Sequence, residues 1–592
     1  MLQAGRGALQ FCLCRQTSRK LSVIVGYPRP LRGSGKMNLV CLDTHLGGQQ
    51  KGILSVSFYH RPSQSCNSKL CFPTGGLCSR LGTRCCVVLA TSSKLYDNKG
   101  LDSSLGSQSR YTDLKDNEPS SLNILEEQLR DLFNEVHAMI RIGKENEARD
   151  LLQANFEAVK EQMDAGNKGI EEAAILDVTA LGYMALGDIR TVKPLLDVLS
   201  EIVGDLKDEE PLLDSILTHM GNMYEKLENL EMSIGMYGRA VKVAERLHGN
   251  TSSFIVTPLL GMAKILGSNG KTKKAIETYH RVVKILESSR GEESEELVVP
   301  LFGMGNLLLK EGRVTDAENA FNRILTTYMK LYGENDGRVG LSLSYLARVK
   351  CAKGDVNEAI DLYKEALHRL KDSDYIAIDD QIMEKMRVDL AELLHAVGRG
   401  EEGRVLLEEC LLITEKFKGE GHPSSVSHLV NLATSYSQSK LFAEAERLLR
   451  MSLQIMFKNV SSDDQSITFP MLHLAVTLYN LNRNEEAEKY ALEVLQIRER
   501  AFGKDSLPVG EALDCLVSIQ TRLGKDDGEL LELLKRVLKI QEKAFGAESE
   551  EVMETLKKIV YYLEKMGRKH EKLPLQRRLS KLRTKYKQMV QY

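Results

Sequence analysis

The segment that most resembles a nucleotide-binding motif runs from Ile265 to Thr272, where Gly-Ser-Asn-Gly-Lys-Thr ends like a phosphate-binding loop. Such a loop holds phosphate groups with backbone amides, and it needs a glycine at the position of Ile265 and a β-strand before it. The hydrophobic periodicity on both sides instead predicts a turn between two helices. We therefore expect no nucleotide to bind here.

The other residues that could do chemistry stand apart from one another. His395 and His473 are isolated on predicted helices and are expected at the surface or in a groove, and His422 has no second ligand at metal spacing. The acidic pairs at residues 379–380 and 463–464 fall where helices should begin, so we predict that they cap helices. No nucleophile lies beside a base. The sequence therefore predicts no enzyme, no metal site and no cofactor.

Charge divides the chain into two parts. Residues 1–96 hold 13 Lys and Arg against the single acid Asp43, a net charge of +12, and the whole chain carries −2, which leaves −14 for residues 97–592. An acidic body repels a phosphate backbone, so nucleic-acid binding is not expected. Eight of the 11 cysteines also lie in residues 1–96. The remaining three are widely spaced, and we predict that they are buried thiols: Cys351, Cys410 and Cys515.

The first 96 residues have the composition of an organellar transit peptide, rich in Ser, Arg and Gly and almost free of acid. Their length favours a plastid over a mitochondrion, so we predict import into the chloroplast stroma. The alternatives are a mitochondrial protein and a cytoplasmic protein with a disordered tail. Residues 97–121 are a polar linker. No apolar run reaches the about 18–20 residues that a membrane-spanning helix needs.

A repeat of 42 residues organises the rest of the chain. Its clearest mark is a small residue near the start of every second helix, with successive spacings of 42, 42, 42, 44, 42 and 42: Ser233, Ala275, Ala317, Ala359, Gly403, Ala445 and Ala487. A period of this size predicts stacked helix pairs, because one pair alone cannot bury its apolar face.

Each repeat contains two amphipathic helices joined by a short turn that often holds a glycine. Small residues let the helices of a pair approach closely, and glycine adopts the left-handed backbone that ends a helix. We predict an all-α, right-handed superhelical solenoid of ten to eleven antiparallel helix pairs over residues 122–592. The last pair, residues 551–592, is basic and is expected to cap the array, although exposed repeat ends also allow self-association.

This small–large pattern resembles the tetratricopeptide repeat. The 42-residue length, the loop at residues 417–423 and the segments 431–436 and 443–449 resemble the kinesin-light-chain subfamily of these repeats, and the transit-like segment indicates a plant organellar type. The resemblance covers residues 123–590. It implies a scaffold whose first helices line a concave groove that binds a peptide or a helical segment of another protein.

The residue that follows the small position of each first helix should point into that groove. Amide and cationic side chains there would suit an extended, mildly acidic segment. The candidate partner-binding residues, including one that lies close to the row, are Asn222, Lys264, Asn306, Arg348, Asn431 and Thr434.

We therefore predict a non-enzymatic protein–protein interaction scaffold that acts in the assembly or regulation of a chloroplast complex. The alternative is a cytoplasmic, kinesin-light-chain-like adaptor for cargo or microtubules. Kinesin light chains join their heavy chains through a long heptad coiled coil, and residues 1–120 contain no such pattern.

Overall fold

The computed structural model describes residues 121–591. In this range the chain forms 22 α-helices and no β-strand. Longer and shorter turns alternate between the helices, so that they follow one another as eleven pairs, which confirms the predicted all-α array. The predicted transit peptide, residues 1–96, and the linker up to residue 120 lie outside the described residues.

Contacts divide the described chain into two compact units on either side of residues 308 and 309. The N-terminal unit contains eight helices, most of a ninth and two short 3-10 helices: α2 (Ser121–Arg141), α3 (Glu145–Asp164), α4 (Ile170–Ala185), α5 (Ile189–Asp205), α6 (Leu213–Lys226), α7 (Leu230–His248), η2 (Ser253–Ile255), α8 (Val256–Ser268), α9 (Thr272–Arg290), η3 (Glu295–Leu297) and most of α10 (Val298–Lys310).

The C-terminal unit contains the remaining helices: α11 (Val314–Tyr332), α12 (Gly337–Lys353), α13 (Val356–Asp372), α14 (Gln381–Ala396), α15 (Gly400–Lys418), α16 (Ser425–Gln438), α17 (Phe442–Asn459), η4 (Gln465–Ile467), α18 (Thr468–Asn480), α19 (Asn484–Phe502), α20 (Leu507–Leu523), α21 (Asp527–Phe545), α22 (Glu550–Lys565) and α23 (Lys569–Gln591).

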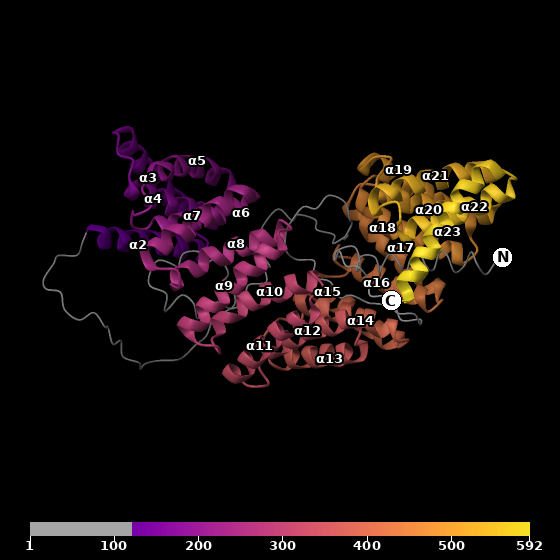
Figure 1. Ribbon diagram of the computed structural model, residues 1–592, viewed down its shortest axis with the longest axis horizontal. Helices are drawn as coiled ribbons and strands as arrows, with labels where there is room; N and C mark the ends of the chain where they lie inside the picture. Colours follow the sequence, from indigo (N-terminus) through magenta and orange to yellow (C-terminus); the bar gives the residue numbers. More distant parts are fainter. Residues whose placement is uncertain (1–120, 592) are drawn as a thin grey trace. The chain divides into compact units, whose positions relative to one another are not determined.

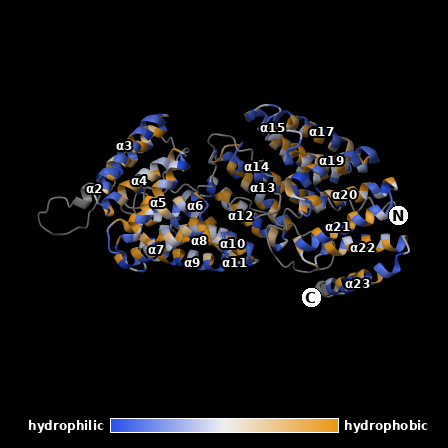
Figure 2. Cartoon of the chain, turned by 90° about the horizontal axis from the view of Figure 1, so that it is seen from above, coloured by the Kyte–Doolittle hydropathy of each residue, from blue (hydrophilic) through white to orange (hydrophobic). Residues whose placement is uncertain are grey.

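Within each unit the helices pack in sequence order. The two helices of a pair contact each other, as α6 and α7 do in the N-terminal unit and α12 and α13 in the C-terminal unit (Figure 1). The second helix of a pair also contacts the first helix of the next pair, as α7 contacts α8 and α17 contacts α18. Each helix therefore buries its apolar stripe against sequence neighbours, which is how repeat arrays are stabilised. Figure 2 shows the hydrophobic and hydrophilic residues that alternate along these amphipathic helices.

The small residues of the repeat all occupy the fourth position of a second helix, and all are buried. A Cβ atom added to Gly403 would lie 2.8 Å from the backbone oxygen of Ala391 on the preceding helix, so the pair is too close there for any side chain. Ser233 is the polar exception. Its hydroxyl donates a hydrogen bond of 2.7 Å to the backbone oxygen of Gly221, so that no polar group is left without a partner at this contact.

Every turn inside a pair contains one residue with positive φ. Eight of the eleven are glycines, and the other three are Glu228, Lys440 and Asn482, with φ of 61°, 62° and 62°. At Lys440 the turn is closed by two backbone bonds, from Lys440 N to Ser437 O (3.0 Å) and from Leu441 N to Tyr436 O (2.9 Å). These two hydrogen bonds are typical of a helix that ends with a residue in the left-handed conformation. Glycine adopts this conformation without a steric cost.

Several predictions about single residues can be checked against the structure. Cys351, Cys410 and Cys515 are buried free thiols, as predicted. Asp380 and Asp464 accept backbone hydrogen bonds as N-caps of α14 and η4, which confirms the predicted caps.

His473 was expected at the surface or in a groove, but it is buried with 3 % of its surface exposed, because α18 is covered along nearly its whole length. No helix of the described residues is both long and apolar enough to span a membrane.

Candidate partner-binding face

The predicted binding residues lie on first helices at a common register. Five of them directly follow the small residue of their helix, and Asn431 lies three residues before Thr434. The N-terminal unit holds three of them on α6, α8 and α10, and the C-terminal unit holds three on α12 and α16: Asn222, Lys264 and Asn306, then Arg348, Asn431 and Thr434. Their role in binding stays a prediction.

These six residues differ in how accessible they are. Lys264 is exposed, and the four neutral residues are half-buried. Arg348 is buried with 9 % of its surface exposed, because α12 is covered on almost all sides between Gly337 and Cys351. A partner therefore reaches little of Arg348. Of the two cations among the six residues, Lys264 is the more exposed to solvent.

Lys264 forms an ion pair across two neighbouring first helices. Its Nζ lies 2.7 Å from Oε1 of Glu225, which is three residues after Asn222 on α6. Residues three apart on a helix lie on the same side, so Asn222, Glu225 and Lys264 belong to one face of α6 and α8. The Lys264 side chain is 43 % exposed and that of Glu225 18 %, so the pair borders solvent.

Two buried tyrosines reach this region from second helices. The ring of Tyr237 on α7 packs between two glycines, and a Cβ atom on Gly221 or Gly261 would lie 2.8 Å or 2.4 Å from its ring carbons. Tyr279 on α9 packs in the same way against Gly303 on α10. Gly261 and Gly303 lie on the helices that come after those of Tyr237 and Tyr279. Each glycine stands two residues before the small residue of its own first helix. The absence of a side chain at these positions lets the rings meet the backbone of the first helices.

The two phenols remain protonated over a wide pH range. Burial raises the pKa of both Tyr237 and Tyr279, and the nearby carboxylate of Glu225 raises each pKa further. Both rings are therefore under the influence of the same acid. We call Asn222, Glu225, Tyr237, Lys264 and Tyr279 the Glu225 cluster.

The Glu225 cluster contains polar groups of several kinds. It combines an ammonium group, a carboxylate, an amide and two neutral phenols, which together can donate and accept hydrogen bonds. Among residues 121–591 no group of three or more His, Cys, Asp or Glu side chains is placed to hold a metal ion. The charged groups of the cluster that border solvent are the ammonium group of Lys264 and the carboxylate of Glu225.

In the C-terminal unit the predicted residues lie beside a contact between first helices. Nε2 of His395 on α14 is 2.6 Å from Oγ of Ser435 on α16, and Oγ1 of Thr434 donates to the backbone oxygen of Val430 at 2.9 Å. Burial lowers the pKa of His395, and Arg404 lowers it further. A neutral imidazole beside a hydroxyl holds α14 against α16. The hydroxyl of Thr434 thus donates within its own helix.

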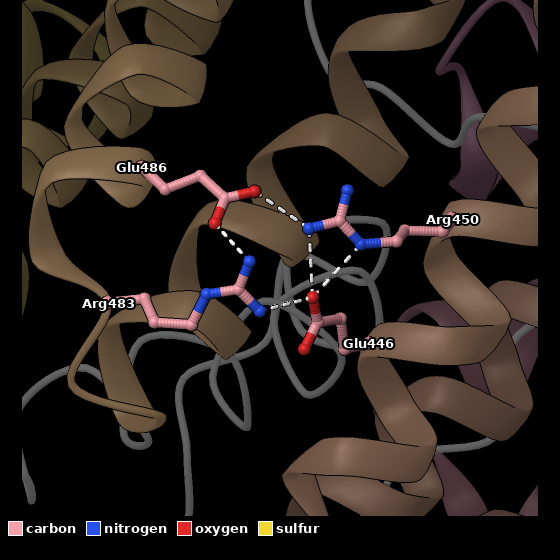
Figure 3. Close-up of polar contacts among 4 residues, drawn as sticks. All are labelled: Glu446, Arg450, Arg483 and Glu486. Carbon is pink, nitrogen blue, oxygen red and sulfur yellow. Dashed lines mark hydrogen bonds and ion pairs between the residues drawn. The ribbon is translucent and has the colours of Figure 1, made fainter.

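A different arrangement of charges joins α17 to α19. Arg450 lies 2.8 Å from Glu446 and 2.7 Å from Glu486, and Arg483 lies 2.6 Å from Glu446 and also pairs with Glu486. Figure 3 shows that the four side chains alternate in sign around a closed ring. We call these four residues the Glu446 ring. Each of its charges is balanced by two opposite charges.

Three members of the Glu225 cluster were not predicted from the sequence: Glu225, Tyr237 and Tyr279. The sequence does not show that the rings of the two tyrosines meet the next first helix. A signal was present in Gly261 and Gly303, which lie 42 residues apart inside predicted helices. Glycine is costly inside a helix, so its recurrence indicates a close approach.

Comparison with known families identifies the repeat. Residues 206–402 match the MalT-like TPR region, and residues 383–456 and 471–507 match two tetratricopeptide repeat families. No curated protein matches the chain.

Solved structures with similar helical arrays include the TPR-like repeats of a kinesin-light-chain-like protein from Podosopora anserina, with 22 % identity over 34 % of this chain and 95 % of that one and a TM-score of 0.32. BtubC (BKLC) from P. vanneervenii is 18 % identical over 43 % of this chain and 93 % of its own, with a TM-score of 0.32. The apo form of the quorum sensor NprR from B. thuringiensis is 12 % identical over 63 % and 99 %, with a TM-score of 0.41.

The family matches cover the same helix pairs in which the 42-residue period, the buried small residues and the left-handed turns recur. Residues 206–456 and 471–507 are therefore identified as tetratricopeptide repeats.

Proposed function

We propose that this protein is a non-enzymatic scaffold that binds a peptide or helical segment of a partner protein along its first helices. The observation that carries the proposal is the Glu225 cluster, in which two glycines admit tyrosine rings beside an ion pair at the border of solvent. Scaffolding is also the general role of tetratricopeptide-repeat proteins.

The composition of the cluster favours a partner segment that carries acidic side chains and whose backbone groups are free to form hydrogen bonds. Lys264 can pair with a carboxylate of the partner while Glu225 accepts a backbone amide, and Asn222 can bond to either edge of an extended chain. Tyr237 and Tyr279 are 4 % and 7 % exposed, so they support the first helices from inside and leave the contact with the partner to the other residues of the cluster. These features support an extended or helical segment as the ligand.

A pull-down from extracts of the source tissue tests this proposal. Lys264→Gln removes the cation of the cluster and preserves most of the side-chain length. Lys273→Gln makes the same change on α9, where Lys273 is exposed and outside the cluster. We expect Lys264→Gln to lose proteins that both the wild type and Lys273→Gln retain. If the two variants retain the same proteins in the same amounts, the cluster does not bind the partner.

We also propose that the protein works in the chloroplast stroma, in the assembly or regulation of a complex there. The basic, acid-poor composition of residues 1–96 supports this location. Its test is imaging of the full chain and of residues 97–592, each with a fluorescent protein at the C-terminus. Plastid signal that is lost on truncation agrees with the proposal.

Mitochondrial signal would keep the scaffold role and move it to that organelle. Cytoplasmic or filament-associated signal from the full chain would instead favour the kinesin-light-chain-like adaptor, which the 42-residue repeat length supports.

A further inference from the structure

One second helix differs from the others on its solvent-exposed side. Val405 and Leu412 stand at the sixth and thirteenth positions of α15, and they are 63 % and 64 % exposed. Because they are seven residues apart, they lie on the same face, about 10 Å from each other along the helix axis. We call these two residues the α15 stripe.

The same two positions are polar in the other second helices. They are exposed in all six of the other second helices that carry the small residue of the repeat, and none of the six holds an apolar side chain at either position. Examples are Glu277 and Lys284 on α9 and Lys489 and Gln496 on α19. The packing of the repeat therefore does not require the α15 stripe. Apolar side chains that gather on an exposed surface mark a site of interaction.

Acidic side chains border the α15 stripe. Glu408 is exposed and lies between the two apolar residues on the same face, and Glu401, with a side chain that is 94 % exposed, precedes them by one turn. Two cations lie nearby. Nη1 of Arg404 donates to Oγ of Ser439 at 2.6 Å, and Lys416 follows the stripe by one turn. The centre of the stripe is therefore acidic.

Glu408 also departs from the charge pattern between second helices. It is the ninth residue of α15, and the ninth residues of α13 and α17 are cations. Each of these cations pairs with the acid at the third position of the next second helix, at 3.4 Å and 2.7 Å: Lys364 with Glu402 and Arg450 with Glu486. The acid at the third position of α17 is Glu444. Between α15 and α17 two acids thus stand at the positions of an ion pair.

Tyr436 on α16 lies beside both acids. Its hydroxyl donates to Oε1 of Glu408 at 3.3 Å. Burial raises the pKa of Tyr436, and the carboxylates of Glu408 and Glu444 raise it further. Glu444 pairs with Arg447 at 3.0 Å, whereas Glu408 forms no ion pair with any part of the chain between residues 121 and 591. A cation from outside the chain can therefore approach Glu408 from solvent.

We propose that the α15 stripe docks a basic amphipathic helix of a partner protein, whose apolar side chains cover the stripe and whose cation lies beside Glu408. An amphipathic helix repeats its apolar residues every three to four positions, so two of them can meet Val405 and Leu412. This surface lies on a second helix. It is therefore separate from the first helices that carry the proposed function.

Charge complementarity selects this partner over other occupants of an apolar surface. A symmetric dimer of this chain would bring Glu401 and Glu408 against the same acids of the second copy. An anionic membrane would face the same repulsion. A basic helix instead supplies the cation that Lys364 and Arg450 provide on α13 and α17.

Fluorescence anisotropy with a labelled peptide tests the proposal on the full chain. The probe is a synthetic amphipathic helix of leucine and lysine, about 18 residues long, which gives five turns. The comparison is the same peptide with glutamate in place of every lysine. We expect the chain to bind the lysine peptide more weakly as salt rises, and not to bind the glutamate peptide. No binding of the lysine peptide, or equal binding of both, would overturn the proposal.

Two variants locate the binding. Val405→Gln with Leu412→Gln removes the apolar stripe, and Glu408→Arg places a cation where α13 and α17 have one. We expect each to weaken binding of the lysine peptide by about tenfold or more, which is about 1.4 kcal/mol. Circular dichroism confirms that each variant folds. Affinities equal to that of the wild type would overturn the proposal.

Matched controls change exposed residues of the same kinds elsewhere. Ile189→Gln with Leu573→Gln removes two other apolar side chains, which are 50 % and 51 % exposed, and Glu231→Arg reverses an exposed acid on α7. Both should bind the lysine peptide like the wild type. Lys264→Gln should do so too, so a failure here is distinguishable from a failure of the proposed function. Losses as large as those of the α15 variants would overturn the assignment to α15.

Sedimentation velocity and flotation with anionic lipid vesicles test the other occupants. We expect the full chain to remain a monomer and not to float with the vesicles. A dimer that Val405→Gln with Leu412→Gln dissociates would show that the stripe binds a second copy. Vesicle binding that the same variant abolishes would show that it binds a membrane. Either result would overturn the proposal.

Discussion

The Glu225 cluster and the Glu446 ring both place charges across neighbouring helices, but they use them differently. In the Glu446 ring each of four charges contacts two opposite charges, and the ring fastens α17 to α19 (Figure 3). In the Glu225 cluster a single ion pair lies beside two neutral phenols and an amide. Each charge of the ring thus lies beside two opposite charges, whereas Lys264 and Glu225 of the cluster form a single ion pair that borders solvent.

The two regions should also respond to pH in opposite directions. Arg450 beside Glu486 holds the pKa of that carboxyl below its usual range, so the ring stabilises the fold above that range and loses this effect as pH falls. Tyr237 and Tyr279 have raised pKa values, so their contribution is complete below the usual tyrosine value of 10.0 and is lost as pH rises. Acid should therefore weaken the ring, and alkali the cluster.

The largest expected effect is that of a side chain at Gly261. Tyr237 lies between Gly221 and Gly261 and is 4 % exposed, so its ring cannot move away from a new methyl group without approaching Gly221. We expect Gly261→Ala to lower the free energy of unfolding by about 2 kcal/mol through overpacking. Chemical denaturation followed by circular dichroism measures it.

Gly235→Ala on α7 is the matched control, because a Cβ atom at Gly235 meets nothing within 4 Å. It should raise stability by about 0.5–1 kcal/mol, as alanine favours a helix over glycine. If both substitutions stabilise the protein, the close contact at Gly261 is not present.

The next effect is the response of the cluster to alkali. Each buried tyrosine should cost about 1.4 kcal/mol of stability at one pH unit above its ordinary pKa, because the unfolded chain releases its proton and the folded chain does not. Tyr237→Phe should remove the loss of stability that one of the two tyrosines causes at high pH. Unfolding measured between pH 9 and pH 11 tests this, and an equal slope for wild type and variant would show that the Tyr237 phenol is accessible to solvent.

Breaking the Glu446 ring should have a smaller effect. Arg483→Gln removes two of the four contacts, and we expect a small loss of stability that shrinks at high salt, because the side chains are partly exposed. Arg447→Gln is the control, since Arg447 pairs with one acid, Glu444, and both are largely exposed. Equal losses for the two variants would mean that the ring adds nothing beyond an ordinary surface pair.

The smallest effect concerns the turns before α7 and α17, the helices that carry Tyr237 and half of the Glu446 ring. Glycine at Glu228 or Lys440 removes the cost of a left-handed backbone but makes the unfolded chain more flexible. The net gain should be about 0.5 kcal/mol at each site. Thermal unfolding measures it, and a loss of stability would indicate that the side chain at that turn makes a favourable contact.

The sequence predicted the features that depend on local pattern. Spacing predicted the helix pairs and the register of Ala275 and its equivalents. Residue type predicted the caps at Asp380 and Asp464. The left-handed turns at Glu228 and Lys440 could not be predicted residue by residue, because neither side chain favours that backbone and the repeat imposes it.

The candidate site was predicted less completely. Lys264 was identified, but its partner Glu225 comes from another repeat, and the sequence does not show which side chains meet across helices. The burial of Arg348 and His473 depends in the same way on how neighbouring helices cover α12 and α18. The register is thus a local property, and accessibility is a property of the packed array.

Site-specific photo-crosslinking tests the central claim most directly. A photoreactive amino acid is placed at Asn222, in the Glu225 cluster, or at Arg447, beside the Glu446 ring, and the protein is illuminated in an extract of the source tissue. We predict that Asn222 crosslinks to a partner protein and that Arg447 does not. Equal crosslinking from both positions, or crosslinking from Arg447 alone, would contradict the assignment of partner binding to the first helices.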